Sequence, residues 1–310
     1  MNIRTTKSIV LLRKLCLYPR ALRLNNPSVQ FISTIPKCEQ LEVVEKDHVF
    51  NVKLNRPESR NAFTLQLWKE LRSVFDHLSD YSKCRAIVLS GNGKSFCAGL
   101  DLKHGLTDII ALLNDNEKDT ARKALELRKF IEIAQGSYTS IEKCRKPVVA
   151  AIHSYCLGAG ISLISCCDIR YASTDAVFSI KEVDVGLAAD VGILQRVQKL
   201  VGNDSLTREL AYTGRNIHSL DALNYGLVSR LFESKDDCIH GAMSLAQEIA
   251  SKSPVAVQGS KMALNYARNH SVEDSLEWII TWNQSQLQTE DLIINAMAKQ
   301  AKQLPEFKDT

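Results

Sequence analysis

Hydrophobic side chains recur along the chain with two different periods, one typical of strands and the other of helices. Residues 41–45 and 49–54 alternate apolar and polar side chains, which predicts two strands joined by a short turn. The next segment carries apolar side chains at helical spacing, and Thr64 is placed to cap that helix. The apolar stripe consists of Leu67, Leu71, Val74, Phe75 and Leu78.

Short apolar runs and longer amphipathic runs continue to alternate up to about residue 202. Strands are expected at residues 86–89, 147–152, 169–172 and 177–180, and a long helix across residues 117–144. Strands separated by helices favour parallel pairing through right-handed crossover connections. The pattern therefore predicts an α/β fold for residues 39–202.

After residue 202 the pattern becomes mostly helical, with one strand-like piece at residues 227–232. Amphipathic stretches rich in Ala, Leu and Ile then follow at residues 254–269, 271–287 and 289–303. A terminal layer of helices with this much apolar surface often packs against another subunit. We therefore expect residues 203–310 to form a mainly helical oligomerisation region.

The composition is that of a globular protein, and it predicts neither a membrane span nor a metal site. The 310 residues are 45% hydrophobic and 24% charged, and no apolar run approaches the roughly 18–20 residues of a spanning helix. The nine cysteines contain no Cys-x-x-Cys pair, and the seven histidines lack metal-binding spacings. We therefore expect reduced cysteines and no metal.

The basic residues are concentrated at the N-terminus. Seven of the 39 Lys and Arg residues lie within residues 1–38, which contain no acid; the other 32 face 35 acidic residues, a net charge of −3. A basic, hydroxyl-rich, acid-free leader is typical of a mitochondrial transit peptide, the alternative being a frayed terminus without a targeting role. We expect a mitochondrial matrix protein with no nucleic-acid partner, because the mature chain is acidic. The C-terminal residues Phe307–Thr310 are not a Ser-Lys-Leu signal, which argues against a peroxisomal location.

Two glycine-containing turns could present backbone N–H groups to a ligand. The first, at residues 95–102, follows a strand and could aim the N–H of Ala98 into a cleft. The second, Gly158-Ala159-Gly160, opens an apolar helix, where small residues admit a ligand and N–H groups favour negative charge. Two such donors would form an oxyanion hole for an enolate. The alternative is that both segments are tight turns that need glycine.

Three acidic residues lie close together in the otherwise apolar residues 181–190. Glu182 and Asp190 are eight positions apart with Gly186 between them, so they need not share one face of a helix. They could flank a slot and act as base and acid at two carbons of one substrate. The spacing alone favours a solvated helix face instead. Asp184, between them, is interpreted as a surface or ion-pair acid.

Several motifs, taken together, resemble one known family. They are Asn55-Arg56-Pro57, Arg60-Asn61-Ala62, Phe96–Leu102, Gly158–Gly160 and Cys167–Arg170. In this combination they are similar to the enoyl-CoA hydratase/isomerase (crotonase) superfamily over about residues 41–302. The run from Lys181 to Gly192 is more specific and resembles the dienoyl-CoA isomerases of that superfamily. A match of this length outweighs the interpretation as a solvated helix face.

The resemblance implies a fold, a substrate class and a reaction. The fold would be the crotonase (ClpP-like) spiral of β-β-α turns, with a C-terminal helical region that forms trimers, often paired into hexamers. The substrate would be an acyl-CoA thioester, bound with its CoA moiety near the Arg60-Asn61-Ala62 turn. The reaction would move both double bonds of a 3,5-dienoyl-CoA to the 2,4 positions in the β-oxidation of unsaturated fatty acids. It would need no cofactor, since CoA is part of the substrate.

The same resemblance implies the roles of individual residues. Glu182 would remove the proton at C2, and Asp190 would return one at C6. Ala98 and Ala159 would supply the N–H groups that bind the thioester oxygen. Lys261, by contrast, is interpreted from the sequence as a structural residue, the alternative being that it reaches a CoA phosphate of a neighbouring subunit. The acyl-CoA site would be lined by Ala98, Gly99, Leu100, Asp101 and Leu102.

Two positions depart from the family pattern. Ser162 stands where hydratases and dienoyl-CoA isomerases carry an acid, which argues against a hydratase and removes a third acid from the site. Ala159 replaces a glycine and adds a methyl group next to the substrate. We therefore expect lowered or shifted activity. Two alternatives stay open: a Δ3,Δ2-enoyl-CoA isomerase that uses Glu182 alone, and a non-catalytic acyl-CoA-binding protein.

Overall fold

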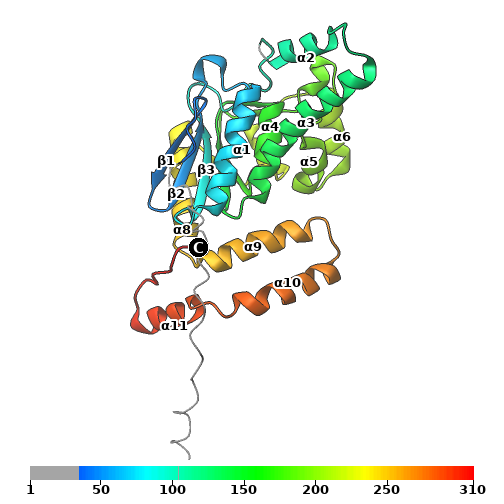
Figure 1. Ribbon diagram of the computed structural model, residues 1–310. Coiled ribbons are helices and arrows are strands. Elements are labelled where there is room, and N and C mark those ends of the chain that lie inside the picture. The colour runs from blue at the N-terminus through cyan, green and yellow to red at the C-terminus, as the bar shows by residue number, and fades with distance from the viewer. Residues whose placement is uncertain (1–34, 104) are drawn as a thin grey trace, which may run out of the picture. The chain divides into compact units, whose positions relative to one another are not determined.

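The computed structural model describes residues 35–103 and 105–310 (Figure 1). The predicted transit peptide, residues 1–38, lies outside this part of the chain except for its last four residues. Six strands form the main sheet in the order β1-β2-β3-β4-β6-β9. The first two pair antiparallel and every later neighbour is parallel. The strands are β1 (Leu41–Lys46), β2 (Val49–Leu54), β3 (Ala86–Gly91), β4 (Val148–Ile152), β6 (Ile169–Ser173) and β9 (Arg230–Phe232).

A second, smaller sheet contains the strands β5 (Tyr155–Leu157), β7 (Val177–Ser179) and β8 (Ile217–His218). β5 is parallel to β7, and β7 is antiparallel to β8. The segment after β3 joins this sheet, because Cys97 forms an isolated bridge with Cys156 in β5. This pairing places the first glycine-containing turn beside the second.

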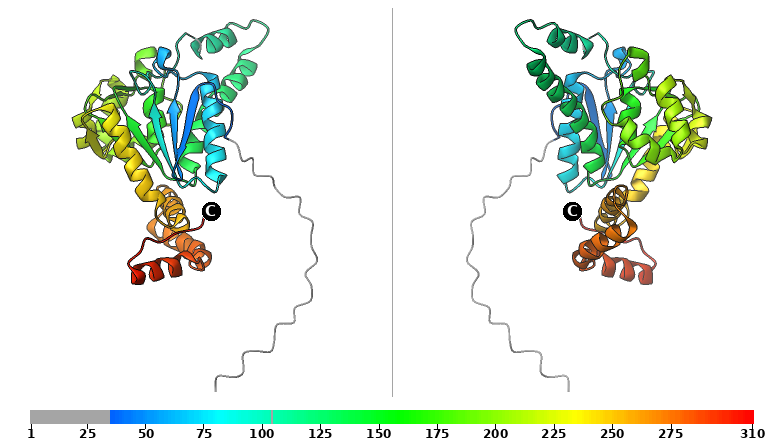
Figure 2. Two further views of the ribbon diagram at one scale, coloured as in Figure 1. Left: turned by 90° about the vertical axis from the view of Figure 1, so that its left-hand side faces the viewer. Right: turned by 90° about the vertical axis from the view of Figure 1, so that its right-hand side faces the viewer.

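Helices cover both faces of the main sheet (Figure 2). Alternate side chains of β3 point to opposite faces, as the two-residue period of a strand requires. Ile87 and Leu89 pack in the large core with α1 (Leu65–Asp80) and α3 (Thr120–Lys143). Ala86 and Val88 pack under α8 (Lys235–Ala250). The sheet is therefore buried on both sides, which explains its nearly continuous apolar strands.

The remaining helices of this part are short and connect the strands to the site. They are η1 (Pro57–Ser59), α2 (Gly105–Leu113), α4 (Ala159–Ser165), η2 (Glu182–Val185), α5 (Ile193–Val201), α6 (Asp204–Thr213) and α7 (Ser219–Asn224). Glu182 begins the single turn η2, which ends at Gly186 in the left-handed region with φ of 83°. Asp190 follows in irregular backbone before α5. Glu182 and Asp190 therefore do not belong to one helix.

The C-terminal helices are α9 (Pro254–Ala267), α10 (Val272–Gln286) and α11 (Asp291–Ala301), and α9 packs beside α10 (Figure 1). Lys261 of α9 is only 5% exposed. Its Nζ lies 2.8 Å from Asp168 Oδ2 and donates to Lys146 O at 2.9 Å. In this position Lys261 ties α9 to the core and is not available to bind a CoA phosphate.

The α/β prediction and most of the predicted elements are confirmed. The strand pair, the four short strands and the long helix all form, and the Thr64 hydroxyl accepts the Leu67 N–H at 3.1 Å as an N-cap. The strands β5 and β8 and the helix α2 were not predicted. β5 and β8 have three and two residues, too few for a periodic pattern.

Candidate active site

The two glycine-containing turns lie against each other at the edge of the small sheet. Cys97 N–H donates to Tyr155 O at 2.9 Å, and Leu157 N–H donates to Cys97 O at 3.0 Å. Gly99, with φ of 101°, comes so close that a Cβ there would lie 3.3 Å from Leu157 O. The same Cβ would lie 4.0 Å from the backbone nitrogen of Ala159. Glycine is therefore needed for this approach as well as for the backbone geometry.

The first turn offers the N–H group of Leu100. Ala98 N–H donates to Arg60 O at 2.9 Å, so this donor is already engaged. Phe63 N–H donates to Gly99 O at 2.8 Å, and Asp101 N–H donates to Phe63 O at 2.9 Å. These two bonds bracket Leu100, whose N–H has no acceptor among the residues that the structure describes. The predicted role of Ala98 as a donor is thus corrected to Leu100.

The second turn offers the N–H of Ala159. Gly158 N–H donates to Ser179 O at 2.9 Å, which fixes the turn to β7. Ile161 N–H and Ser162 N–H both donate to Gly158 O and begin α4. Ala159 is the first residue of that helix, and its N–H has no hydrogen-bond partner in the described chain. Leu100 and Ala159 together present two free donors, the requirement for an oxyanion hole.

Glu182 places its carboxyl group beside these donors. A Cβ on Gly158 would lie 3.6 Å from Glu182 Oε1 and 3.9 Å from Oε2, so the absence of a side chain at Gly158 leaves room for the carboxyl group. Oε2 is buried and has no hydrogen-bond partner among the described residues. Burial raises the pKa of Glu182, and the negative charge of Asp190 adds to this effect. A carboxyl group with a raised pKa next to an oxyanion hole is suited to act as a general base.

Asp190 is the second acid of the site. η2 and Gly186 separate it from Glu182 in sequence, and its negative charge contributes to the raised pKa of Glu182. Partial burial also raises the pKa of Asp190. Asp184, by contrast, forms an exposed ion pair with Lys181 at 2.9 Å. Asp184 thus takes part in a surface ion pair. The assignment of Glu182 and Asp190 as the acid pair stays a prediction from the sequence.

Asp101 stabilises the turn at residues 95–102. Its Oδ2 lies 2.9 Å from Arg56 Nη2 in a buried ion pair, and Arg56 also donates to Ala62 O. Asn61 is fully buried, and its Nδ2 donates to Asn92 O and Ser95 O. The motifs around Arg56 and Asn61 thus hold the 95–102 turn in place. The adjacent Leu102 is 54% exposed and is available to an apolar ligand.

Two further polar residues belong to the site: Ser162, which the sequence analysis singled out, and Gln135, which it did not. Ser162 is buried, and its Oγ has no hydrogen-bond partner in the described chain. Gln135 was missed: its Nε2 donates to Asp190 O at 2.6 Å from helix α3. A polar residue in a long amphipathic helix carries no signal of such a contact. His153 is a buried histidine, and burial lowers its pKa to about 4, which keeps the imidazole neutral.

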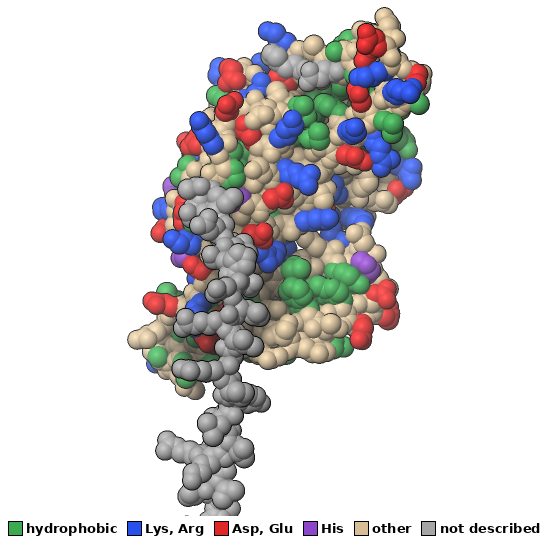
Figure 3. Space-filling view, in the orientation of Figure 1, with side chains coloured by type: hydrophobic (Ala, Val, Ile, Leu, Met, Phe, Trp, Pro, Cys, Tyr) green, Lys and Arg blue, Asp and Glu red, His purple; other side chains and the backbone are tan. Residues whose placement is uncertain are grey.

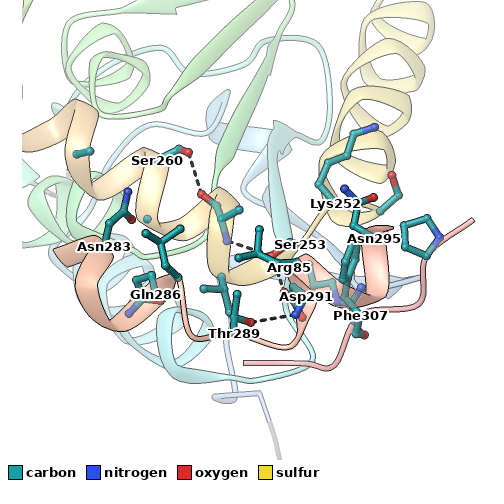
Figure 4. Close-up of a pocket in the computed structure, with 18 of the residues that line it drawn as sticks. Arg85, Lys252, Ser253, Ser260, Asn283, Gln286, Thr289, Asp291, Asn295 and Phe307 are labelled. Atoms are coloured by element: carbon teal, nitrogen blue, oxygen red, sulfur yellow. Dashed lines mark hydrogen bonds between the residues drawn. The ribbon is translucent and has the colours of Figure 1, made fainter. Parts of the chain in front are cut away.

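A separate cavity lies away from these residues. It has a volume of about 1160 Å³ and is lined by α9, α10, α11 and residues 304–307, with Arg85, Ser253 and Asp291 among its lining residues (Figure 4).

No group of three or more acidic, His or Cys residues in the described chain is placed to bind a metal ion. Across residues 35–103 and 105–310, no helix has the length and apolarity needed to cross a membrane.

Comparison with known proteins identifies the family. The family model described as enoyl-CoA hydratase/isomerase matches residues 44–309. The chain belongs to the enoyl-CoA hydratase/isomerase family. Among solved structures, an enoyl-CoA hydratase from Bacillus anthracis aligns with a TM-score of 0.77 at 27% identity, covering 87% of this chain and 99% of that one. A putative enoyl-CoA hydratase from Streptomyces coelicolor aligns with a TM-score of 0.81 at 27% identity, covering 91% and 99%. The predicted crotonase fold is confirmed.

Within the family, several relatives that are at least 40% identical to the chain carry one name. The mitochondrial Δ(3,5)-Δ(2,4)-dienoyl-CoA isomerase of Rattus norvegicus is 51% identical over 265 residues, 85% of this chain and 80% of that protein. The human mitochondrial protein of this name is 48% identical over 261 residues, 84% and 79% of the two chains. The peroxisomal protein of this name from Arabidopsis thaliana is 40% identical over 277 residues, 88% and 99%.

Proposed function

We propose that this chain is an isomerase of fatty acid β-oxidation that converts 3,5-dienoyl-CoA to 2,4-dienoyl-CoA. One observation carries the proposal: two carboxyl groups with interacting charges, Glu182 and Asp190, accompany two free N–H groups, Leu100 and Ala159. Relatives named for this activity are about half identical to the chain. The arrangement supplies a base, an acid and an oxyanion hole, which is the set that a double shift of double bonds requires.

The reaction is a proton transfer from C2 to C6 through a dienolate. The thioester oxygen accepts hydrogen bonds from Leu100 N–H and Ala159 N–H, which makes the C2 proton more acidic. The Glu182 carboxylate takes that proton, the electron pair of the C2–H bond forms C1=C2, and the carbonyl pair moves onto the thioester oxygen to give the dienolate. As the carbonyl re-forms, the C1=C2 pair moves to C2=C3, the C3=C4 pair moves to C4=C5, and the C5=C6 pair takes a proton from Asp190 at C6. No water is added, and atoms and charge balance.

Two features support isomerisation over hydration. Ser162 offers a hydroxyl group where a hydratase needs a second carboxylate to hold the attacking water, and it lies fully buried. The second acid present, Asp190, lies beyond Glu182 in a separate segment and is suited to a distant carbon atom. The reaction proposed uses no cofactor, since the thioester itself activates the substrate.

We also propose a location and an assembly. The acid-free leader at residues 1–38 supports import into the mitochondrial matrix, and relatives from rat and human are named as mitochondrial. A homotrimer or homohexamer is supported by the exposed apolar side chains of α9–α11, and Figure 3 shows such side chains gathered where α9 and α10 lie.

The first test is a direct assay with three substrates. Purified protein is given a 3,5-dienoyl-CoA, and the ultraviolet spectrum is followed for the conjugated 2,4-dienoyl product. Parallel reactions contain a 3-enoyl-CoA and a 2-enoyl-CoA. We expect rapid conversion of the dienoyl substrate. Turnover of the 3-enoyl substrate alone would instead assign a Δ3,Δ2-enoyl-CoA isomerase, and binding without turnover of any substrate would assign a non-catalytic protein.

A variant pair tests the role of the second acid. Asp190→Asn removes the proton donor for C6, and we expect product formation to fall by about 10³-fold or more, the scale of losing one general acid. Asp184→Asn is the matched control, because it changes an exposed acid of the same segment. Full activity of the Asp190→Asn protein would refute the two-acid mechanism.

A further inference from the structure

One face of helix α3 holds the backbone segment that carries Asp190. Gln135 Nε2 donates to Asp190 O at 2.6 Å. Glu142 lies two helical turns further along α3, on the same face. Its Oε2 accepts hydrogen bonds from Arg196 Nη2 at 2.7 Å and from Nε at 3.2 Å. Two side chains of α3 thus reach this segment, one directly and one through Arg196.

Arg196 connects Glu142 to the segment. Its Nη1 donates to Gly192 O at 3.2 Å, two residues after Asp190. Gly192 has φ of 120°, and a Cβ there would collide with the Arg196 guanidinium group. Glycine at this position is therefore what allows the guanidinium group to lie against the backbone. The backbone from Asp190 to Gly192 is held at both ends.

The second carboxylate oxygen of Glu142 forms an ion pair with the C-terminal region. Oε1 lies 2.8 Å from Nη1 of Arg268, the residue that follows α9. Asn265 of α9 donates to Glu142 O at 2.9 Å. The side chains of Glu142, Arg196 and Arg268 are between 14% and 27% exposed, so water screens this ion cluster only partly. The two guanidinium groups lower the pKa of Glu142 although partial burial opposes this, which keeps the carboxyl group ionised.

We propose that Glu142 is a positioning residue for Asp190. It holds Arg196 against Gly192 and so fixes the backbone from which Asp190 reaches the substrate, and Arg268 makes this placement depend on α9. The inference rests on the proposed function, in which Asp190 delivers the proton to C6. A displacement of about 1 Å can cost about 100-fold in rate. Glu182 follows β7, and among the described residues no hydrogen bond joins its carboxyl group to α3, so the variants should leave proton removal at C2 unchanged.

The two proton transfers can be measured separately in D₂O. A dienolate formed by Glu182 either returns to the substrate with deuterium at C2 or gains a proton at C6 and leaves as product. Mass spectrometry gives the ratio of C2-deuterated substrate to product. This exchange-to-product ratio reports the Asp190 step relative to the Glu182 step, and a general loss of folded protein does not change it.

Two variants and one matched control carry the test. Glu142→Gln and Gln135→Ala should each raise the exchange-to-product ratio about tenfold or more and lower kcat, with KM unchanged. Gln135 is exposed, so Gln135→Ala keeps the test valid if Glu142→Gln folds poorly. Glu132→Gln is the control, because Glu132 forms an exposed pair with Arg128 on the same helix. It should leave both quantities unchanged.

The outcomes separate this inference from the function on which it rests. An unchanged ratio in both variants overturns the positioning role, even if kcat falls in step with thermal stability, because Glu142 and Gln135 would then only stabilise the fold. A wild-type protein that exchanges the C2 proton but forms no 2,4-dienoyl product overturns the proposed function, and the positioning role with it. That result appears in the wild-type sample before any variant is compared.

Discussion

Glu182 occupies a position that is unfavourable for its own charge. Burial and the nearby Asp190 raise its pKa, and Oε2 has no hydrogen-bond partner in the described chain. Folding therefore disfavours the carboxylate form that the reaction needs. The protein gives up stability at this residue, and the raised pKa brings the base closer to neutral pH, where general bases work best.

This cost predicts that Glu182→Gln stabilises the protein at neutral pH. An acid with a raised pKa binds more protons in the folded state than in the unfolded state at pH values between its ordinary value of 4.5 and the raised value. Stability therefore falls as the pH rises through that window, and the full cost is present above it. Glutamine carries no charge, so the melting temperature of the variant should exceed that of the wild type at pH 7.

The pH dependence provides the control for this prediction. Below about pH 4.5 Glu182 is protonated in both states, so the stabilising effect of Glu182→Gln should vanish there. Asp184→Asn, at an exposed acid of the same segment, should not give this pH-dependent gain. Equal melting temperatures of the Glu182→Gln and wild-type proteins at both pH values would contradict the assignment of a buried, charged base.

At the residue level, the acids carry a signal in the sequence, whereas the backbone amides carry none. Glu182 and Asp190 stand out because acids are rare in an apolar segment. The free N–H was assigned to Ala98, whereas the structure leaves that of Leu100 free. The difference depends on Arg60 O, which accepts the Ala98 N–H from a distant turn. Which amide is left without a partner is a property of tertiary pairing, so no local pattern reveals it.

The turn at residues 95–102 depends on a buried ion pair between separate elements. Arg56, just before η1, pairs with Asp101 at 2.9 Å, and their side chains are 11% and 8% exposed. Removing one partner of such a pair takes away the opposite charge that stabilises the other buried group, which typically costs about 3–5 kcal/mol. The turn also carries Leu100, so the pair supports the proposed oxyanion hole.

We therefore expect Arg56→Met to lower the free energy of unfolding by about 3–5 kcal/mol. Urea denaturation of the purified protein measures this change. Arg72→Met is the matched control, because Arg72 forms an exposed pair with Asp76 on α1, a type of pair worth at most about 1 kcal/mol. Similar effects of the two substitutions would show that the Arg56–Asp101 pair does not hold the turn.

Helix α9 depends on a second buried ion pair. Lys261 pairs with Asp168, whose Oδ2 also accepts the Val148 N–H at 2.7 Å. We expect Lys261→Met to destabilise the protein by about 3–5 kcal/mol while leaving the KM for a CoA thioester unchanged. Lys252→Met, in an exposed pair with Glu248, is the control. A rise in KM without loss of stability would restore a role for Lys261 in binding CoA.

At the element level, prediction succeeded where the pattern was long. The β1–β2 pair and helices α1, α3 and α9–α11 each span enough residues to repeat their period. Helix α2 and strands β5 and β8 were missed. β5 matters most, because its backbone aligns Cys97 with the Gly158 turn. A three-residue strand has too few side chains to show alternation, and it forms only because neighbouring strands supply its hydrogen bonds.

On the scale of the whole molecule, the C-terminal helices have two relationships to the rest of the chain. Lys261 and Arg268 tie α9 to the core through buried or partly buried ion pairs. Large apolar side chains of the same region face outward, among them Leu276, Ile280 and Met297. Exposed large apolar side chains that gather in one region are typical of an interface. The sequence predicted the amphipathic helices, while the contacts that orient them were visible only in the fold.

An assembly of several copies should therefore depend on this surface. Leu276 and Ile280 lie four residues apart on one face of α10, with 58% and 55% of each residue exposed. Glutamate at both positions would bury two uncompensated charges in an interface, which is strongly unfavourable. Light scattering should give the mass of a trimer or hexamer for the wild type and of a monomer for the Leu276→Glu, Ile280→Glu protein.

Leu220→Glu on α7 is the matched control for this assembly, because Leu220 is equally apolar and 62% exposed but lies outside α9–α11. It should leave the mass unchanged. Because Arg268 links α9 to Glu142, and Glu142 reaches the Asp190 segment through Arg196, dissociation should also raise the exchange-to-product ratio. A wild-type monomer, or a doubly substituted protein that keeps the mass of the assembly, would rule out α10 as part of the interface.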